Sequence, residues 1–513
     1  MSERIVLFEV DGYTDVAAYT THRYSTRGYA TWPADTPAST VYEGRLLTPL
    51  RARREMFYNG GSRGATQTGF GSVDLANALG AADHDLAATF RTRSFIERAA
   101  RVLVGYSDAA YSTFTQVYKG TVAELQVSAS KISFVLKDRQ RDIENPHQQT
   151  KFAGSNSLPN GLEGVADLAG KAKPLIYGKV FNISPPLVNT SRLIYQVNSA
   201  TISTLDAVYD GGVALTSGAA YASQADMETT APSVGQYRVW INASGSYFRL
   251  GSSPVYQITA DVTAHSAANS TTAQILKAMA LAAGIAAGDV SAADVSALDA
   301  VNTHVQGIYI DDDITTTDAM SLIAVGAGAF FGFDLLGVLR MGVPTVGTPV
   351  MNITSNNAQG WEYATNADTG LSRLSVTVGY AKYWTTQDSG LASSITAAAR
   401  SDLAQQYRRT TAITTVSPNP YKRDNKLTVD TLLTAKANAD TLAAALQLTA
   451  PTQLITIKGV ALTPAQAAAL QIGCTVNVPW AAPYTATNLR LVYAIDLDFA
   501  SLTADITVDG FPV

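Results

Sequence analysis

The segment LRLVYAIDLDFASLTADITVDG, residues 489–510, has the pattern of a β-hairpin. Apolar side chains occupy every second position on both sides of a turn at Ser501, which places them on one face of a half-buried sheet. The positions in step are Leu491, Tyr493, Ile495, Leu497 and Phe499 before the turn, and Leu502, Ala504, Ile506 and Val508 after it. The end of the chain is therefore predicted to complete a β-domain.

A second segment of the same design lies nearer the N-terminus. It is VYKGTVAELQVSASKISFVLKD, residues 117–138, in which Ile132, Phe134 and Leu136 form one apolar face. Both segments consist of a strand, a turn of small residues, a second strand and an acidic end. Their similarity suggests a duplicated β-barrel, although hairpins with this pattern also arise by chance.

The rest of the chain predicts further strands and a few helices, so the fold class is α+β and mostly β. Strands or hairpins are expected at 5–10, 192–197, 205–215, 236–251, 330–342 and 371–384, and helices at 270–284, 394–409 and 434–448, with a capped helix start at 315–318. Residues 95–106 fit either a helix or a strand. Residues 151–173, rich in Gly, Asn and Ser, are the best candidate linker.

The composition favours a protein that buries surface against partners. The chain has 513 residues, enough for about three or four domains. Charged residues are only 15% and hydrophobic residues 46%, whereas about 25% charged is usual in soluble domains. A surface with few charges is easier to bury, because desolvating charge costs free energy. An ordinary soluble protein with a mild bias fits the same numbers, so both interpretations stay open.

The distribution of charge gives no sign of nucleic-acid recognition. The net charge is −5, so sequence-specific nucleic-acid binding is not expected. Between Arg45 and Arg101 the chain has nine arginines, no lysine and five acidic residues. Arginine without lysine fits a contact surface, but a solvated face with internal salt bridges explains the same composition.

The chain offers no disulfide and no membrane segment. Its one cysteine, Cys474, excludes an internal disulfide, and its neighbours QIGCTVNV predict a buried thiol at a core strand. Only four consecutive apolar residues precede Glu9, which is too short for a signal peptide. The longest apolar run, 322–339, contains four glycines and Asp334, which argues against a membrane span. Synthesis and folding in a cytoplasm are therefore expected.

Residues with the spacing of a known catalytic or metal motif are missing from the sequence. The histidines, each expected at the surface or at a helix cap, are His22, His84, His147, His265 and His304. The run 311–313 is three aspartates, but it lacks the alternating ligands of an EF-hand and directly precedes a helix cap, where negative charge is favourable. No catalytic, cofactor-binding or metal-binding residue is predicted, and no cofactor.

Several motifs together resemble the tail hub proteins of long-tailed bacteriophages and gene transfer agents. The segments that carry the resemblance are FGSVDLANALGAADHDL (70–86), VYKGTVAEL (117–125), ISFVLKDRQRDIENP (132–146), KPLIYGKVFNISPPLVNTSRLIYQV (173–197), VTVGYAKYWTTQ (376–387) and ALQIGCTVNV (469–478). They follow the family's order over most of the chain. Within 173–197, the adjacent prolines Pro185 and Pro186 are expected to hold an extended connection, and Gly178 to permit a bend or a close approach. An ordinary loop stiffened by proline would look the same.

The resemblance implies a multidomain fold with two tail-tube-like β-barrels and further domains inserted between them. The implied divisions are a tube-like barrel at 1–165, an inserted β-rich domain at 166–262, an α/β domain at 263–355 and a second tube-like barrel with helices at 356–513.

The resemblance also implies a structural, non-enzymatic role as a homotrimeric hub at the tail tip or baseplate of a virion assembled in the host bacterial cytoplasm. Three chains with two barrels each would present a pseudo-sixfold ring to the tail tube or distal tail protein and a threefold face to a fibre or central spike. The tape measure protein is a further expected partner. Phage DNA would pass through the central channel without sequence-specific binding, and no stable membrane insertion is expected.

Two other functions stay open at this point. A virion-associated glycan hydrolase needs only two carboxylates across a cleft, so the lack of a motif does not exclude one. A carbohydrate-binding receptor protein would use aromatic side chains, which the 24 tyrosines could supply, although they are spread along the chain.

Overall fold

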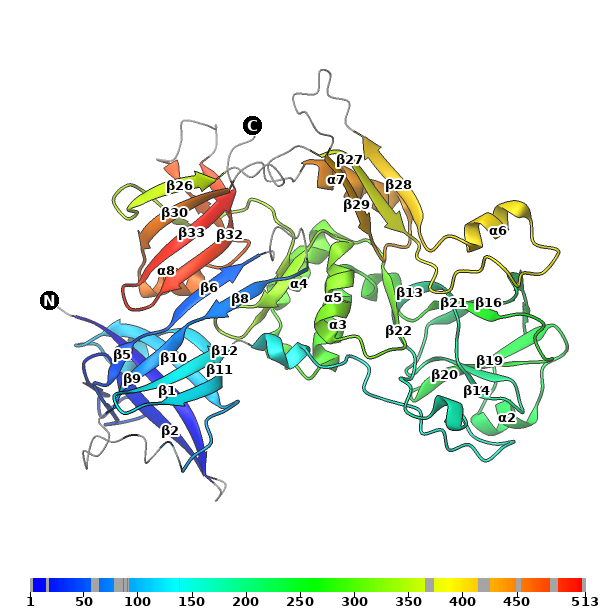
Figure 1. The fold of residues 1–513 in the computed structure, drawn as a ribbon, viewed down its shortest axis with the longest axis horizontal. Coiled ribbons are helices and arrows are strands. Elements are labelled where there is room, and N and C mark those ends of the chain that lie inside the picture. The colour runs from blue at the N-terminus through cyan, green and yellow to red at the C-terminus, as the bar shows by residue number, and fades with distance from the viewer. Residues whose placement is uncertain are drawn as a thin grey trace.

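The structure, a computed structural model, describes residues 3–14, 18–56, 64–77, 86, 90, 92–137, 139–364, 373–413, 425–448, 454–479 and 488–509. Strands account for 43% and helices for 19%, so the expectation of a mostly β fold is confirmed. Two sheets lie at one end of the elongated molecule, a second β-rich body lies at the other, and helices lie between them (Figure 1). The chain is thus β-rich and multidomain, as expected.

The first sheet, called sheet 1, is antiparallel and has the order β2-β1-β10-β11-β12-β9-β5. Its strands are β1 (Arg4–Thr14), β2 (Ala18–Ser25), β5 (Leu46–Thr48), β9 (Ser72–Ala76), β10 (Ala99–Tyr106), β11 (Thr115–Val127) and β12 (Lys131–Lys137). The short strands β3 (Tyr29–Ala30) and β4 (Val41–Tyr42) pair with each other. The apolar face predicted on β12 lies in the core, because Ile132, Phe134 and Leu136 are all buried.

The second sheet, called sheet 2, has the order β25-β31-β32-β33-β30-β26, and β6 and β8 extend it beside β32. Its strands are β6 (Arg51–Glu55), β8 (Gln67–Phe70), β25 (Pro349–Asn352), β26 (Gly360–Ala364), β30 (Leu454–Ala461), β31 (Thr475–Asn477), β32 (Leu489–Asp498) and β33 (Thr503–Asp509), with helix α8 (Pro464–Ala469). The alternating apolar residues predicted for the closing hairpin are buried in its core, except Tyr493, which is partly buried against it. Two strands of this sheet thus come from the N-terminal part of the chain (Figure 1).

The far β-rich body contains two five-stranded sheets, β17-β16-β21-β13-β22 and β14-β15-β20-β19-β18. Its elements are β13 (Leu175–Ile183), β14 (Leu187–Asn189), β15 (Ile194–Asn198), β16 (Thr204–Asp210), β17 (Val213–Ala214), β18 (Thr216–Ser217), α2 (Gln224–Thr229), β19 (Gln236–Asn242), β20 (Gly245–Leu250), β21 (Ile258–Thr263) and β22 (Gly307–Ile310). Side chains from both sheets, among them Val180, Phe248 and Val262, share one core.

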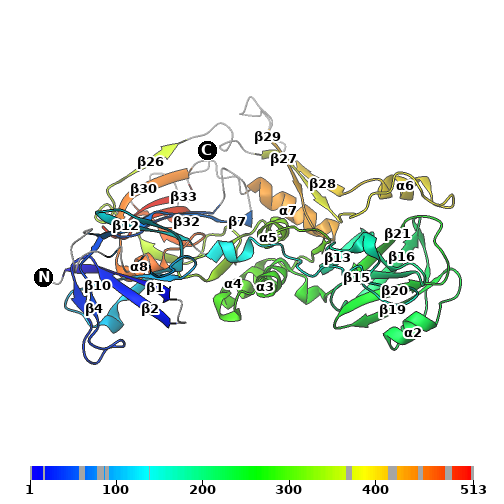
Figure 2. The same cartoon turned by 60° about the horizontal axis from the view of Figure 1, so that its bottom comes forward.

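A helical layer connects this body to the paired sheets (Figure 2). It contains α3 (Thr272–Ala282), α4 (Ala292–Val301), α5 (Thr316–Val325) and the ladder β24-β23-β7, formed by β7 (Gly64–Ala65), β23 (Phe330–Phe333) and β24 (Leu339–Gly342). A last unit contains α6 (Ala397–Leu403), α7 (Lys436–Leu448) and the sheet β28-β27-β29, formed by β27 (Arg373–Tyr380), β28 (Arg408–Ile413) and β29 (Asn425–Asp430). Helix α7 packs its predicted inward residues, Leu442 and Leu446, against this sheet.

Most of the predicted elements are confirmed, and one is wrong in part. The segment 95–106, which fitted a helix or a strand, ends in strand β10. The helix predicted at 394–409 stops at Leu403, because the chain then turns and Arg408 begins β28 opposite Tyr380 of β27. In the described residues the end strands of sheet 1, β2 and β5, are not paired with each other, so the expectation of two closed barrels is not confirmed. The divisions at residues 165, 262 and 355 stay predictions.

Candidate assembly surface

Sheets 1 and 2 contain the same five-stranded unit. In sheet 1 the order is β10-β11-β12-β9-β5, and in sheet 2 it is β31-β32-β33-β30-β26. All four strand pairs are antiparallel in both units. The order along the chain also agrees: β5, β9, β10, β11, β12 in one unit and β26, β30, β31, β32, β33 in the other. The two predicted hairpins therefore occupy equivalent positions in a repeated unit.

The two units also share an irregularity. Both hairpins have a register shift near the open end. It follows two pairs in one hairpin, between Val122 and Glu124 of β11, and one pair in the other, between Val492 and Ala494 of β32. Ala123 and Tyr493 are the extra residues. Because a β-bulge changes the direction and twist of a strand at one defined position, its repetition supports the equivalence of the two units independently of strand order.

A two-stranded arm from the N-terminal region, β6 and β8, joins sheet 2. Strand β6 pairs antiparallel with β32, and Arg54 lies opposite Ile495. The Arg51 guanidinium donates two hydrogen bonds of 2.8 Å to the carboxylate of Asp496, and this contact, with its charge, raises the pKa of Arg51. The arm is therefore attached to sheet 2 by backbone and side-chain contacts.

The arm also carries a buried cation. Arg54 is 3% exposed, and it donates to the side-chain oxygen of Gln471 and to the carbonyl oxygen of Phe333, both at 2.6 Å. One continuous hydrophobic cluster includes residues of both sheets, such as Phe134 of sheet 1 and Ile506 of sheet 2. The two sheets therefore form one body, because separating them would open a shared core and strand a buried charge.

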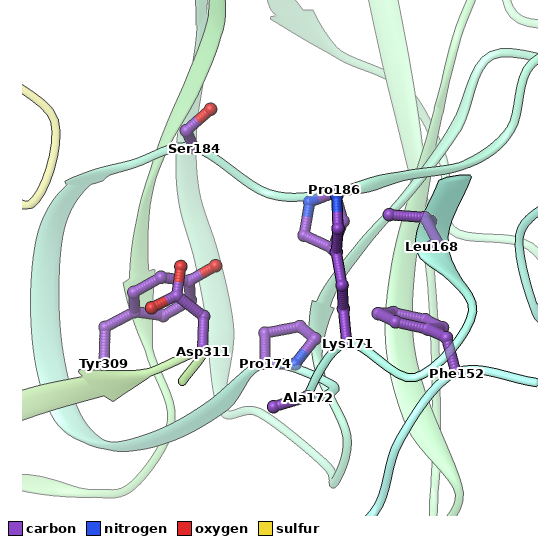
Figure 3. A pocket seen from close by; sticks show the side chains of 9 residues that line it. All are labelled: Phe152, Leu168, Lys171, Ala172, Pro174, Ser184, Pro186, Tyr309 and Asp311. Carbon is purple, nitrogen blue, oxygen red and sulfur yellow. The ribbon is translucent and has the colours of Figure 1, made fainter. Parts of the chain in front are cut away.

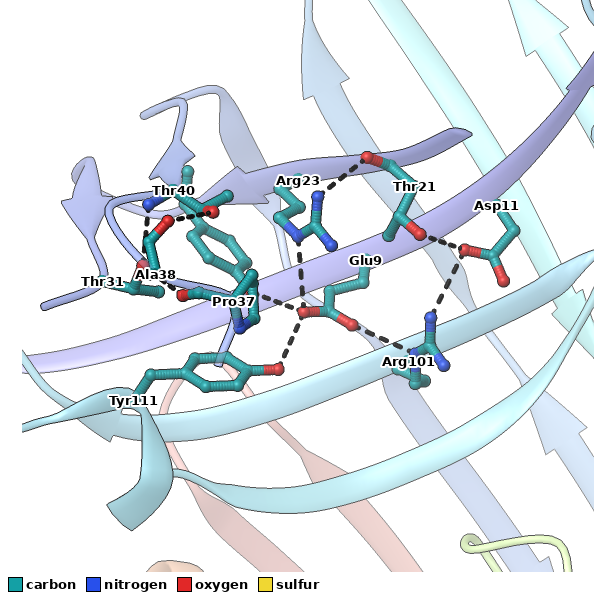
Figure 4. Close-up of polar contacts among 11 residues, drawn as sticks. Glu9, Asp11, Thr21, Arg23, Thr31, Pro37, Ala38, Thr40, Arg101 and Tyr111 are labelled. Carbon is teal, nitrogen blue, oxygen red and sulfur yellow. Dashed lines mark hydrogen bonds and ion pairs between the residues drawn. The ribbon is translucent and has the colours of Figure 1, made fainter. Parts of the chain in front are cut away.

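Among the described residues, four of the nine arginines in the arginine-rich stretch pair with carboxylates of the same chain. Arginines of this stretch that pair with a carboxylate are Arg45 with Glu43, Arg51 with Asp496, Arg53 with Glu55, and Arg101 with Glu9 and Asp11. Glu9 is 5% exposed and accepts hydrogen bonds from Tyr42, Tyr111 and Arg101 (Figure 4). Burial, then the hydrogen bond to Glu9, raises the pKa of Tyr42. The internally salt-bridged interpretation is confirmed for these residues.

The end strands of both sheets carry exposed apolar side chains. In sheet 1 these are Tyr19 on β2 and Leu47 on β5, and in sheet 2 they are Val350 on β25 and Trp361 on β26. Their exposed fractions run from 41% for Val350 to 65% for Tyr19. Large apolar groups on end strands favour association with other strands, so these edges are the strongest candidate contact surface.

A cavity of about 180 Å³ lies between the segment 151–174 and the far β-rich body (Figure 3). It is lined by Phe152, Leu168, Lys171, Ala172, Pro174, Ser184, Pro186, Tyr309 and Asp311. Tyr309 is 5% exposed, and burial raises the pKa of its hydroxyl. Asp311 supplies the one carboxylate of this lining, so the cavity lacks the carboxylate pair of a glycosidase.

A second depression, of about 320 Å³, lies on sheet 2 and contains three aspartates. Their carboxylates are all engaged: Asp496 with Arg51, Asp505 with Lys458 at 3.2 Å, and Asp498 with the turn at 500–501. These contacts hold the β32–β33 hairpin and the arm in place, which is a structural use of the carboxylates.

The histidines were expected at the surface or at helix caps, and His147 departs from this expectation. His147 is buried, which corrects its expected surface position, and its ring contacts the hydroxyls of Thr316 and Tyr177; burial lowers its pKa to about 4. His84 lies outside the described residues. Among those residues, no group of three or more His, Cys, Asp or Glu could hold a metal ion. The described helices are all too short or too polar to cross a bilayer.

The aspartates at 311–313 do not cap the following helix directly. The cap is Thr315, whose hydroxyl accepts from the backbone N–H of Asp318; Asp313 instead pairs with Lys151, and Asp312 accepts from the backbone N–H of Ile314. Desolvation, and then the charge of Asp312, raises the pKa of Asp311. The aspartates therefore place negative charge near the start of α5, and Asp313 also links this loop to the segment that contains Lys151.

Gly178 has the close approach predicted for it. Its φ is +70°, and an added Cβ would lie 1.9 Å from the carbonyl oxygen of Gln306. Pro185 and Pro186 form the short connection between β13 and β14, and Pro186 lines the 180 Å³ cavity. The two prolines therefore stand in the short connection where the sequence predicted an extended segment.

The chain is similar to known proteins in structure and not in sequence. No protein-family model matches the sequence, and no curated protein matches it. The 43 kDa tail protein of prophage MuSo2 from Shewanella oneidensis is similar over 99% of both chains, with 10% identity and a TM-score of 0.43. A chain of the gene transfer agent virion is similar over 72% of this chain and 92% of its own, with 14% identity and a TM-score of 0.44. A tail protein from Neisseria meningitidis MC58 is similar over 92% of this chain and 93% of its own, with 11% identity and a TM-score of 0.42.

Proposed function

We propose that this chain is a structural component of a phage-type tail and acts there as a homotrimeric hub at the tail tip or baseplate. Three copies form a ring that joins the sixfold tail tube or distal tail protein to a threefold fibre or central spike. The DNA leaves through the centre of the ring. The protein is made in the host cytoplasm, and the tape measure protein is a further neighbour.

The repeated five-stranded unit is the observation that carries this proposal. Each chain contributes two equivalent units, and both have the same strand order and the same bulge. Three chains therefore supply six similar units around one axis. A sixfold neighbour can then meet a nearly repeating surface, while the inserted domains, present once per chain, keep threefold symmetry.

The surface chemistry supports an assembly role. Only 15% of the residues are charged, and the end strands of both sheets expose apolar side chains. The shared core makes the two sheets one rigid body, so the angle between the units is fixed within each chain. A connector needs this rigidity, because ring closure depends on a constant angle from copy to copy.

Imaging of tails by electron cryomicroscopy tests the proposal. We expect this chain as three copies in a ring around the tail axis, with units of sheets 1 and 2 alternating around a channel wide enough for duplex DNA, about 20 Å. A single copy, or three copies without an axial ring, would reject the hub role. Incubation of the purified chain with cell-wall and capsular glycans is the complementary assay, and we expect neither cleavage nor binding.

A further inference from the structure

The two copies of the repeated unit differ in one respect: β32 of sheet 2 has a partner strand at a position where β11 of sheet 1 has none among the described residues. In sheet 2, β32 pairs along one edge with β33, and along the other edge first with β31 and then with the arm strand β6, which covers 494–498. In sheet 1, β11 pairs along one edge with β12. Along the other edge it pairs with β10 as far as Thr121, and Val122 exchanges backbone hydrogen bonds with Glu97 and Arg98 just before β10. Among the described residues, no strand pairs with 124–127 on that second edge.

The shared bulge fixes the equivalence of these two edges residue by residue. Val122 and Glu124, which flank the bulge of β11, correspond to Val492 and Ala494 of β32. Leu125 and Val127 then correspond to Ile495 and Leu497, which lie opposite Arg54 and Ala52 of β6. The open edge of β11 is therefore the same structural position that β6 occupies in sheet 2.

The backbone of this edge is oriented to receive a strand. The N–H of Ser128 donates to the carbonyl oxygen of Lys131 on β12 at 2.8 Å. Because hydrogen-bonding directions alternate along an antiparallel strand, the N–H groups of Leu125 and Val127 point away from β12. Side chains along the edge reach solvent, and Val127 is 43% exposed. A free edge with exposed apolar side chains is a template for strand addition.

We propose that the edge of β11 at residues 124–127 binds a strand from a second copy of this chain, and that the strand comes from the part of that copy that contains sheet 2. Within one copy, sheet 1 contributes an arm to β32 of sheet 2. In a ring where the two units alternate, the junction between copies brings sheet 2 of one copy to sheet 1 of the next. If a strand of one copy pairs with β11 of the next as β6 pairs with β32 within one copy, the edge of β11 is filled and the ring closes.

The topology leaves room for such a donor. The arm β6–β8 is inserted between β5 and β9 of sheet 1, and the equivalent connection in sheet 2, between β26 and β30, carries the unit of β27, β28, β29 and α7. Both units thus extend from the same point of their repeat. Glu124 is exposed on the acceptor edge and bonds only to the neighbouring Gln126 side chain among the contacts described, so the pairing is set mainly by backbone groups and apolar side chains.

The test compares Val127→Pro with Val127→Thr in the full chain. Proline removes the outward N–H without touching a β11–β12 hydrogen bond, and proline is tolerated on strand edges. Threonine keeps the N–H and the branched shape. The mass of each protein is measured by sedimentation over a concentration series. We expect a trimer for the wild type and for Val127→Thr, and at least a tenfold higher concentration for half-assembly of Val127→Pro.

Hydrogen exchange of peptides covering 121–130 provides the local readout. We expect slower amide exchange at Leu125 and Val127 in the trimer than in the dilute monomer, and near-ultraviolet circular dichroism checks that each variant is folded. This inference rests on the proposed ring. A trimer that Val127→Pro leaves intact, with unprotected amides at 125 and 127, overturns the edge contact but not the hub. A wild type that stays monomeric at every concentration overturns the edge contact, while imaging of tails decides the hub separately.

Discussion

Arg51 on β6 and Asp496 on β32 form a two-bonded ion pair between residues 445 positions apart in the chain, with both N–O distances at 2.8 Å. The pair marks the place where the N-terminal arm enters the C-terminal sheet. Because Arg51 is 65% exposed, the pair itself adds little stability, as exposed ion pairs contribute about 0–1 kcal/mol. The attachment of the arm must therefore depend mainly on the backbone ladder and on the buried neighbour, Arg54.

Replacing Arg54 is expected to destabilise the protein far more than replacing its neighbour Arg53. Arg54→Ala removes the donor to Gln471 and to the carbonyl oxygen of Phe333, and leaves buried acceptors at a cost of about 1–3 kcal/mol each. Arg53 is 66% exposed and pairs with Glu55, so Arg53→Ala should stay within about 0.5 kcal/mol of wild type. Urea unfolding of both variants measures the difference, and equal losses would contradict the buried role of Arg54.

Gly178→Ala is expected to be strongly destabilising, because its Cβ would collide with the backbone carbonyl of Gln306. Gly170 is the matched control: it also has a positive φ, +79°, but an added Cβ meets nothing within 4 Å. Gly170→Ala should therefore cost only the strain of the backbone conformation, about 1 kcal/mol, whereas Gly178→Ala must also move β13 or β22. Thermal unfolding compares them, and similar melting temperatures would refute the close approach.

Stability should fall as the pH drops from about 6.5 towards 4, in part through His147. Burial lowers the pKa of His147 to about 4 in the folded protein, whereas the unfolded chain keeps about 6.5. Between these values the unfolded state binds the proton and the folded state does not, so acid favours unfolding by up to about 1.4 kcal/mol per pH unit. The free energy of unfolding, measured in urea at pH 7, 6 and 5, should change less with pH for His147→Asn than for the wild type. An unchanged pH dependence would exclude His147 as a cause of the acid destabilisation.

Cys474 should react slowly with thiol reagents in the folded protein. Burial raises the pKa of its thiol to about 11, so at pH 8 the reactive thiolate is scarce. We expect modification by a disulfide reagent to follow the rate of unfolding and to be immediate in denaturant. Rapid labelling of the native chain would show instead that β31 opens readily.

Local patterns were enough to predict the hairpins, but they could not reveal where their strands go. The β32–β33 hairpin is visible because Ile495, Leu497 and Ala504 alternate with polar residues over a short stretch. The arm strand RARRE has Ala52 and Arg54 as its inward residues, and a buried arginine hides the apolar alternation that would mark a strand. Its partner is also hundreds of residues away, and no local pattern encodes that distance.

The helix predicted at 394–409 also shows that a local pattern does not reveal long-range pairing. Ala399, Leu403 and Tyr407 have helical spacing, but the chain leaves the helix after Leu403, since Arg408 and its neighbours pair with β27. Tertiary pairing overrode a local preference there. The equivalence of the two sheets, in contrast, was visible as a resemblance between two hairpins, because a repeat leaves its pattern in both copies of the unit.

The pairing of β6 with β32 joins residues that are synthesised far apart in time. Residues 51–55 leave the ribosome well before residues 494–498 exist, and at about 5–20 residues per second that interval is roughly 20–90 s. During this time β6 has no β32 to pair with, and Arg54 has no Gln471. Strand β8 is available early to pair with one edge of β6, but the other edge stays without its partner until translation is nearly finished, and an unpaired strand edge is prone to non-native association.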